Sequence, residues 1–217
     1  MKEIKKNIIT FIKENRVSTT EVADCLGKSG VIPGVMPINV GGFSVGEARW
    51  VYAFAESNWD LHKQIEDIEK DKIIFIEGIE CNERAVAGEL VSKYLLLYRQ
   101  ARAIVVNGKM RDAHRLIKER YPIWCKGVTP IGCFNKKPDT QLDEGEYKKR
   151  KEMYDGSVMV CDDSGVVVIP EPYCTEEFLG KLKHIEDQED IWFDCIDRRK
   201  WSTFDTVCMK KYLEEDK

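Results

Sequence analysis

Residues 85–112 read AVAGELVSKYLLLYRQARAIVVNGKMRD, and this stretch does most to decide the fold. Apolar residues recur in its first half at three- and four-residue steps, the period of an α-helix, at Leu90, Tyr94, Leu97 and Ala101. Residues 103–106, AIVV, are apolar and rich in β-branched side chains, which is typical of a short strand covered on both faces. Asn107-Gly108 is a turn signal. The stretch therefore predicts a helix that begins at Gly88 and leads into a buried strand.

The start of this helix offers unpaired backbone donors. The first four N–H groups of a helix have no intrahelical partner, and the helix dipole attracts negative charge to that end. Such an end can bind a carboxylate or a phosphate. The donors here belong to Gly88, Glu89, Leu90 and Val91.

Charged residues close the predicted strand, at Arg111 and Asp112. The planar guanidinium of Arg111 is suited to binding a carboxylate. The carboxylate of Asp112 is a hard oxygen ligand of the kind that Mg²⁺ and Mn²⁺ prefer. A helix that leads away and a strand that returns can bring Gly88 and Arg111 to the same end of a sheet, so we expect one pocket for a small acid and its cation. The alternative is an ordinary surface ion pair between Arg111 and Asp112.

The composition is that of a soluble globular protein. The chain has 217 residues, 43% of them hydrophobic and 33% charged, which fits a single domain over residues 1–217. We expect its core at about 17–170 and a helical tail at about 175–217. The formal net charge of −4 argues against nucleic acid as a partner. No apolar run approaches the roughly 20 residues of a membrane span, and the charged N-terminus is unlike a secretory signal, so we expect a cytoplasmic protein that binds no membrane.

The eight cysteines predict neither a disulfide scaffold nor a zinc site. They form no Cys-x-x-Cys pair and no cluster with histidine, so reduced thiols are expected. The Gly-rich residues 30–46 contain neither of the common phosphate-binding glycine patterns, which argues against nucleotide binding. His62 and His114 are interpreted as bystanders, because lone histidines on helices are more often structural than catalytic.

Hydrophobic periodicity predicts alternating helices and strands along the rest of the chain, which is typical of an α/β protein. Helices are predicted at residues 2–14, 21–26, 58–70, 113–120 and from 175 onward. Strands are predicted at residues 47–55, 72–77, 121–125, 158–161 and 166–169. Ser18 and Glu21 form a capping box for a helix that stops near Gly27. The charged residues 136–154 are predicted to form a solvated surface loop.

Gly88-Glu-Leu at the start of a helix, followed by Ile-Val-Val-Asn-Gly-x-x-Arg-Asp at 104–112, resembles the RraA-like family. That family includes metal-dependent 4-hydroxy-4-methyl-2-oxoglutarate aldolases and the RraA inhibitors of ribonuclease E. The resemblance continues in residues 18–27, 45–48, 121–130 and 162–170. It implies an α/β fold of the swivelling β/β/α type, with layered sheets and flanking helices, assembled as a homotrimer or homohexamer.

The resemblance also implies an activity, the divalent-metal-dependent cleavage of a 4-hydroxy-2-oxo diacid to pyruvate, with oxaloacetate decarboxylation as a side activity. Asp112 is expected to hold Mg²⁺ or Mn²⁺, and Arg111 to act in catalysis and hold the 2-oxo acid. Glu89 is expected to assist catalysis. The 2-oxo acid is expected to bind the start of the helix as well, at Gly88, Glu89, Leu90 and Val91.

The chain departs from the aldolases of the family at two points. They usually carry Asp directly after the glycine, where Glu89 stands here, and the interval from that acid to Arg111 is one residue longer. Leu90 is therefore the alternative counterpart. In the aldolases a glutamate from the C-terminal part of a neighbouring subunit completes the site, and Glu186 and Glu189 are the candidates here.

Two other functions remain open from the sequence. A non-catalytic RraA-like protein would bind a ribonuclease E-type partner, and another lyase or isomerase would act on a different 2-oxo acid. Asp112 favours the aldolase, because the regulators generally lack this residue.

Overall fold

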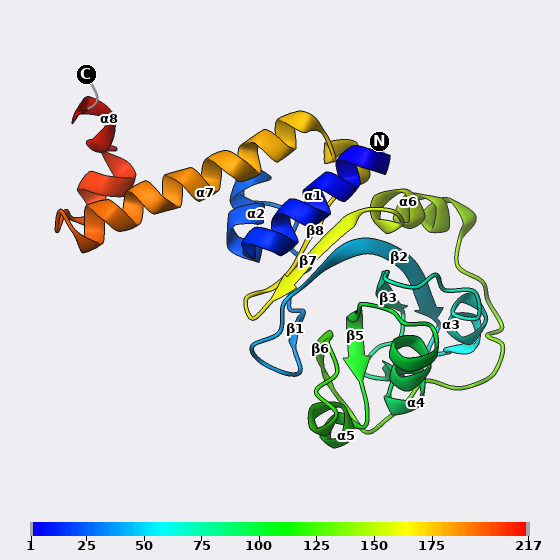
Figure 1. The fold of residues 1–217 in the computed structure, drawn as a ribbon. Coiled ribbons are helices and arrows are strands. Elements are labelled where there is room, and N and C mark those ends of the chain that lie inside the picture. The colour runs from blue at the N-terminus through cyan, green and yellow to red at the C-terminus, as the bar shows by residue number, and fades with distance from the viewer. Residues whose placement is uncertain (1, 216–217) are drawn as a thin grey trace.

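The computed structural model describes residues 2–215, which form a mixed α/β fold built on an eight-stranded sheet (Figure 1). The strands are β1 (Met36–Pro37), β2 (Ser44–Phe54), β3 (Ile73–Ile79), β4 (Ala85–Ala87), β5 (Ala103–Met110), β6 (Ile123–Val128), β7 (Val158–Asp162) and β8 (Gly165–Ile169). The α-helices are α1 (Lys2–Asn15), α2 (Thr19–Cys25), α3 (Trp59–Gln64), α4 (Glu89–Lys93), α5 (Ala113–Lys118), α6 (Glu144–Tyr154), α7 (Glu176–Asp197) and α8 (Tyr212–Glu215). Shorter turns of π-helix lie at η1 (Tyr94–Tyr98) and η3 (Phe204–Cys208), and a 3-10 turn at η2 (Glu171–Tyr173).

The long strand β2 joins two parts of the sheet. The strand order is β1-β6-β5-β3-β2-β7-β8, with β4 paired to β5. The first residues of β2 pair antiparallel with β7, and its later residues pair parallel with β3. The strands β3, β5 and β6 continue this parallel part. Figure 1 shows α1, α2 and α7 beside the β7–β8 hairpin, and α3, α4 and α5 around the parallel strands. The expected fold class, an α/β protein with sheet layers and flanking helices, is confirmed.

Both faces of the parallel strands are buried, as the sequence predicts for β3 and β5. In β3, Ile74 and Ile76 pack in one hydrophobic cluster, and Ile73 and Phe75 pack in another on the opposite face. All four side chains have no exposed surface. A third cluster fills the space between α1, α2, α7 and the β7–β8 hairpin.

The sequence signals for the two ends of α2 are confirmed by the structure. Ser18 and Glu21 form both bonds of the predicted capping box, and Gly27 follows the end of α2 with a φ of 71°. The helix observed here is shorter than the predicted 58–70, because α3 ends at Gln64, although the three apolar residues of the predicted face, Leu61, Ile65 and Ile68, are all buried.

The turn predicted at Asn107-Gly108 is wrong. Both residues lie inside β5, which continues to Met110 and has neighbouring strands on both sides. The Asn107 side chain donates a hydrogen bond to Glu77 of β3 at 3.0 Å. Gly108 faces the backbone of Gly78, where a Cβ would lie 3.7 Å away. Strand pairing therefore overrides the local turn preference.

The helix predicted after Gly88 is present, but the apolar residues whose spacing predicted it are not all on its buried face. Leu90 and Leu97 are 76% and 58% exposed, whereas Val91 and Leu95 are buried. The chain changes from α4 to the π-helical η1 at Tyr94, which rotates the later side chains relative to the earlier ones. Large apolar side chains consequently face outward beside the start of α4.

The surface loop predicted at 136–154 is also wrong, because its second half forms α6. Asp143 caps this helix by accepting a hydrogen bond from the Glu146 N–H at 2.9 Å. Arg150 reaches from α6 to the buried Glu77, with 2.9 Å between Nη1 and Oε1. No side chain of α6 is buried, so the helix carries no apolar stripe by which sequence periodicity could reveal it.

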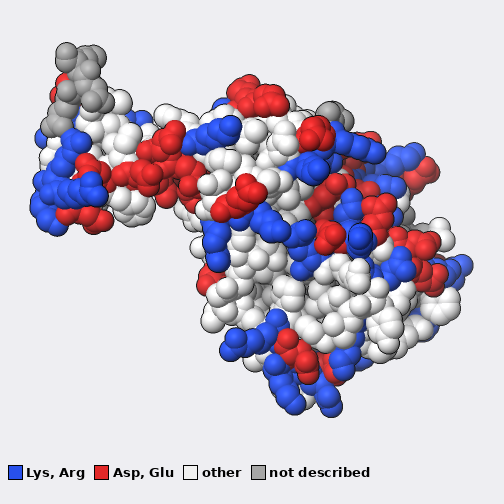
Figure 2. All heavy atoms as spheres, in the orientation of Figure 1, with Lys and Arg blue, Asp and Glu red and all other residues white. Residues whose placement is uncertain are grey.

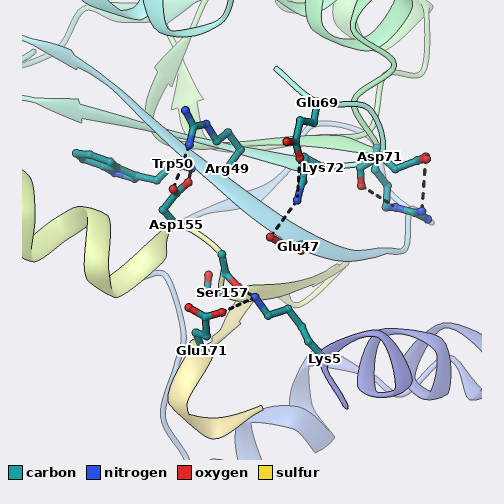
Figure 3. A network of polar contacts seen from close by, with 12 residues as sticks. Lys5, Glu47, Arg49, Trp50, Glu69, Asp71, Lys72, Asp155, Ser157 and Glu171 are labelled. Atoms are coloured by element: carbon teal, nitrogen blue, oxygen red, sulfur yellow. Dashed lines mark hydrogen bonds and ion pairs between the residues drawn. The ribbon is translucent and has the colours of Figure 1, made fainter. Parts of the chain in front are cut away.

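Ion pairs line a cavity of about 850 Å³ between α1 and the sheet (Figure 3). Lys5 of α1 donates to the Gly156 carbonyl at 2.6 Å and to Glu171 at 2.8 Å. Lys72 lies 3.0 Å from Glu47 across the β2–β3 pair. The contacts of Lys5 link α1 to η2, and the Lys72–Glu47 pair links the neighbouring strands β2 and β3. Each of these two lysines is therefore paired with a glutamate.

The helix α7 extends away from the sheet and carries an acidic surface (Figures 1 and 2). Near its middle, Glu186 faces Glu21 of α2 and lies close to Glu189 and Asp190. Partial burial, together with the negative charges of these neighbours, raises the pKa of Glu186 to about 7. No helix within residues 2–215 combines the length and apolar character needed to cross a membrane.

Breaking the Arg150–Glu77 pair is expected to destabilise the protein. Arg150→Ala leaves the Glu77 carboxylate buried without its cation, which typically costs about 3 kcal/mol or more. The control Lys148→Ala removes an exposed pair with Glu144 on the same helix and should cost about 0.5 kcal/mol or less. Urea unfolding measures both free energies, and equal losses would contradict an anchoring role for Arg150.

Neutralising Glu186 is expected to stabilise the protein only at higher pH. The native state keeps a proton on Glu186 up to about pH 7, whereas an unfolded glutamate releases it near 4.5. The native state therefore binds more protons across this window, and its stability falls as the pH rises through it. Glu186→Gln should raise the Tm relative to wild type at pH 8 and leave it nearly unchanged at pH 4.5. The exposed control Glu152→Gln should shift the Tm equally at both values, and equal shifts for Glu186→Gln would contradict the raised pKa.

Candidate active site

The short strand β4 brings Gly88 to the end of β5. β4 pairs parallel with β5, and the Arg111 N–H donates to the Ala87 carbonyl at 3.0 Å. Gly88 follows β4 directly, and α4 begins with Glu89. The start of α4 and the residues after β5 therefore meet at one edge of the sheet, as the sequence predicts.

Close packing at Gly88 leaves no room for a side chain. A Cβ there would lie 2.5 Å from Asp112 Oδ2 and 2.7 Å from Arg111 Cγ. Gly132 serves the same purpose on the other side of the guanidinium, because a Cβ at Gly132 would lie 2.8 Å from Arg111 Nη1. The two glycines form the walls between which Arg111 is held.

Asp112 caps the start of α4. Its Oδ2 accepts a hydrogen bond from the Glu89 backbone N–H at 3.1 Å and lies 3.7 Å from Arg111 Nε. The backbone of Asp112 is left-handed, with φ 61° and ψ 30°, a conformation that costs a residue with a side chain about 1 kcal/mol or more. This turn points the carboxylate back toward Gly88 instead of outward along α5.

The side chain of Glu89 is held by two cations. Its carboxylate lies 2.8 Å from Lys93 and 3.2 Å from Arg115. The hydrogen bond from Lys93, aided by the charge of Arg115, lowers the pKa of Glu89. Glu89 is therefore ionised and already paired, and its backbone N–H is taken by Asp112.

Arg111 lies between two hollows of the surface, and its side chain is 50% exposed. The inner hollow, of about 60 Å³, includes Asn58, His62, Gly88, Leu90, Val91, Arg111, Gly132 and Cys133 in its lining. The outer hollow, of about 430 Å³, is lined by Arg111, Asp112, Ala113, His114, Val128, Thr129 and Pro130. The guanidinium can thus contact a ligand in either hollow, whereas the Asp112 carboxylate faces the outer one.

Asn58, which immediately precedes α3, and His62 of α3 also line the site, although from the sequence His62 is interpreted as a bystander and Asn58 is not selected. Asn58 is buried, and its Oδ1 has no hydrogen-bond partner. His62 lies one helical turn later and lines the same inner hollow. A polar atom that is buried without a partner marks a place where a ligand can bind. The spacing of four residues at a helix start was the available signal.

The donor set suits a divalent cation that keeps much of its water. Among residues 2–215, no three His, Cys, Asp or Glu side chains converge in a way that could enclose a metal. Asp112 offers one carboxylate, and 40% of its side chain is exposed. Mg²⁺ commonly binds through one or two carboxylates and completes its shell with water and substrate oxygens. Asp112 therefore fits such an ion, and a closed protein cage for another metal does not form.

Comparison with known proteins matches the chain to one family. The family model RraA-like, described as Aldolase/RraA, matches residues 19–168. A Halalkalibacterium halodurans protein, provisionally named 4-hydroxy-4-methyl-2-oxoglutarate aldolase, is 26% identical over 209 residues, which cover 95% of both chains.

Solved structures share the fold. An uncharacterized protein from Pseudomonas syringae pv. tomato aligns with a TM-score of 0.70 and 21% identity over 93% of this chain and 96% of that one. Streptomyces coelicolor RraAS2, described as an unusual member of the RNase ES inhibitor RraA protein family, aligns with a TM-score of 0.65 and 20% identity over 85% and 94%. With the family model spanning most of the sequence, the chain belongs to the RraA-like family.

Proposed function

We propose that the protein is a divalent-metal-dependent aldolase that cleaves a 4-hydroxy-2-oxo diacid and releases pyruvate. The observation that carries this proposal is the meeting of Arg111 and Asp112 at Gly88, which places a carboxylate-binding cation beside a metal-binding anion. The name of the Halalkalibacterium halodurans relative points to the same chemistry. The same arrangement would also support decarboxylation of oxaloacetate.

Arg111 binds and orients the 2-oxo acid in this proposal. Its guanidinium offers two parallel N–H donors to a carboxylate, and the glycines at 88 and 132 fix its position. A fixed position matters because orienting the scissile bond lowers the barrier of the reaction. Leu90 and Val91 line the inner hollow, and their N–H groups in the first turn of α4 are further donors available to the substrate.

Asp112 holds the Mg²⁺ or Mn²⁺ in this proposal. When bound, the ion supplies Lewis-acid stabilisation of the negative charge that develops on the 2-oxo oxygen as the carbon–carbon bond breaks. Asp112 also fixes the start of α4 through the Glu89 N–H, so one carboxylate links the metal site to the substrate-binding helix. Glu89 assists from its place between Lys93 and Arg115 by keeping these cations near the site.

His62 and Asn58 supply polar groups in the inner hollow. The ring nitrogens of His62 can donate or accept a hydrogen bond, and Asn58 offers an unpaired carbonyl oxygen. Both groups lie on the Arg111 side of the site. We assign them the part of the substrate that carries the 4-hydroxyl group, whose proton must leave when the carbon–carbon bond breaks.

Assembly as a homotrimer or homohexamer belongs to the same proposal. Apolar side chains that a monomer would leave in water surround the site, at Leu90, Leu97, Tyr98, Ile117, Val128 and Ile131. Exposed apolar groups gathered in this way are typical of an interface. A neighbouring copy would cover them, and Glu186 or Glu189 of that copy could complete the site.

Removal of either charged residue is expected to abolish turnover. Arg111→Ala and Asp112→Asn should each lower kcat/KM for pyruvate release by about 100-fold or more, the usual cost of losing one group that stabilises developing charge. A coupled pyruvate assay with Mg²⁺, and with a chelator, measures both the variants and the metal dependence. Lys118→Ala on α5, outside both hollows, is the control and should retain activity. No turnover of any 2-oxo acid with Mg²⁺ would favour a protein-binding regulator, whereas turnover that survives the chelator would contradict the role of the metal.

A methyl group at Gly88 is expected to disrupt the site. Gly88→Ala would push Asp112 and Arg111 apart, because its Cβ would lie 2.5 Å from Asp112 Oδ2. We expect loss of about 100-fold or more in kcat/KM. The control Gly180→Ala lies on α7 with nothing within 4 Å of its Cβ, and should stabilise the protein by about 1 kcal/mol without changing activity. Full activity of Gly88→Ala would contradict the packing argument.

A further inference from the structure

Two cysteines lie behind Arg111 on neighbouring segments of chain. Cys81 follows β3 and precedes β4, and Cys133 follows β6. The Ala85 N–H donates to the Ile131 carbonyl at 2.8 Å, and the Cys133 N–H donates to the Ala85 carbonyl at 2.9 Å. The segment that leads to Gly88 and the segment that carries Gly132 therefore run side by side.

The two thiols face each other in the hydrophobic core. Cys81 is 3% exposed and Cys133 is 8% exposed, and both belong to the cluster that contains Val86 and Ala87. The two thiols interact electrostatically with each other, and the Cys81 S–H donates to the Ile79 carbonyl at 3.4 Å. Interacting thiols on two adjacent segments are the starting point for a disulfide.

The surroundings distinguish the two sulfurs. Cys133 lines the inner hollow and so meets the surface, whereas Cys81 does not line it. The interaction with the Cys81 thiol, aided by the positive charge of Arg84, lowers the pKa of Cys133. The same interaction, together with burial, raises the pKa of Cys81. Arg84 is held in place by donating to the Gly132 carbonyl at 3.1 Å. Cys133 is therefore the more reactive sulfur, because the thiolate is the nucleophile.

We propose that Cys81 and Cys133 form a reversible intramolecular disulfide when a small hydroperoxide enters the inner hollow. The Cys133 thiolate attacks the peroxide oxygen, an S–O bond forms, the O–O bond breaks, and hydroxide leaves and takes up a proton. Cys81 then gives up its proton and attacks the Cys133 sulfur, an S–S bond forms, and the S–O bond breaks with release of a second hydroxide that becomes water. Two thiols and one hydrogen peroxide thus yield one disulfide and two waters.

The disulfide acts on the wall of the candidate site. It links the segment that ends at Gly88 to the segment that carries Gly132, and these glycines hold Arg111 between them. A covalent link between the two segments limits how far they can separate, and so limits how far the glycine walls on either side of Arg111 can move. Oxidation thus alters the pocket that holds Arg111, while the guanidinium itself is unmodified.

Peptide mapping after peroxide treatment tests the disulfide without an activity assay. The folded wild-type chain is exposed to hydrogen peroxide, remaining thiols are blocked in denaturant, and non-reduced peptides are analysed by mass spectrometry. We expect a peptide pair joined through Cys81 and Cys133, lighter by the mass of two hydrogen atoms and separated by dithiothreitol. Hydrogen exchange of the backbone amides in the two linked segments should slow by about fivefold or more.

Single-cysteine variants test the order of the steps. Cys81→Ser should leave Cys133 as a sulfenic acid that dimedone labels, whereas Cys133→Ser should leave Cys81 unlabelled. The control Cys125→Ser changes a buried cysteine whose sulfur contacts the Gly127 carbonyl, and should form the disulfide as wild type does. The proposal is overturned if peroxide oxidises the exposed Cys208 while Cys81 and Cys133 of the wild-type chain remain free thiols. Because the mapping needs no substrate, this outcome is independent of the proposed aldolase activity.

Discussion

The close approach of Arg111 and Asp112 to Gly88 is the constraint on which the candidate site depends. It arises from the parallel pairing of β4 with β5, which places Gly88 beside the residues that follow Met110. The missing side chain at Gly88 then lets the Asp112 carboxylate reach the Glu89 N–H. A backbone arrangement thus fixes two charged side chains that are otherwise half exposed. Their position depends little on the solvent-exposed ion pairs around them, which contribute weakly in water.

The sequence predicts the part of the site that comes from one continuous stretch. Residues 85–112 contain Gly88, the buried strand and the charged pair, and local periodicity is enough to order them. Asn58 and His62 come from α3, and Gly132 comes from the segment after β6. Their approach to Arg111 is created by the sheet, which pairs strands far apart in sequence. Apart from the four-residue spacing of Asn58 and His62 at a helix start, the sequence near these residues carries no mark of that approach.

The two errors in the fold have a common cause. Asn107-Gly108 has a strong local preference for a turn, but Asn107 pairs with Glu77 of β3, and Val106 and Lys109 on either side pair with β6, which keeps it in β5. Residues 144–154 have no apolar stripe, but the Arg150–Glu77 pair fixes α6 against the sheet. In both places a contact distant in sequence decides the structure. The strands at residues 73–76 and 103–106 were predicted correctly, because a continuous apolar run is itself the sequence pattern of a strand buried on both faces.

The presence of Glu89, where the family's aldolases usually have Asp, can be understood from the charges around its side chain. In the family's aldolases an Asp usually follows the glycine, and here the longer Glu89 turns toward Lys93 and Arg115. Its carboxylate is thereby drawn away from the Gly88 N-terminal turn, and Asp112 accepts the Glu89 N–H instead. One acid has moved outward and the other remains at the start of the helix, so the site keeps a single carboxylate beside Arg111. The π-helical turn η1 follows α4 directly, and a π-helical turn is a place where one additional residue before Arg111 can be accommodated without displacing the start of α4.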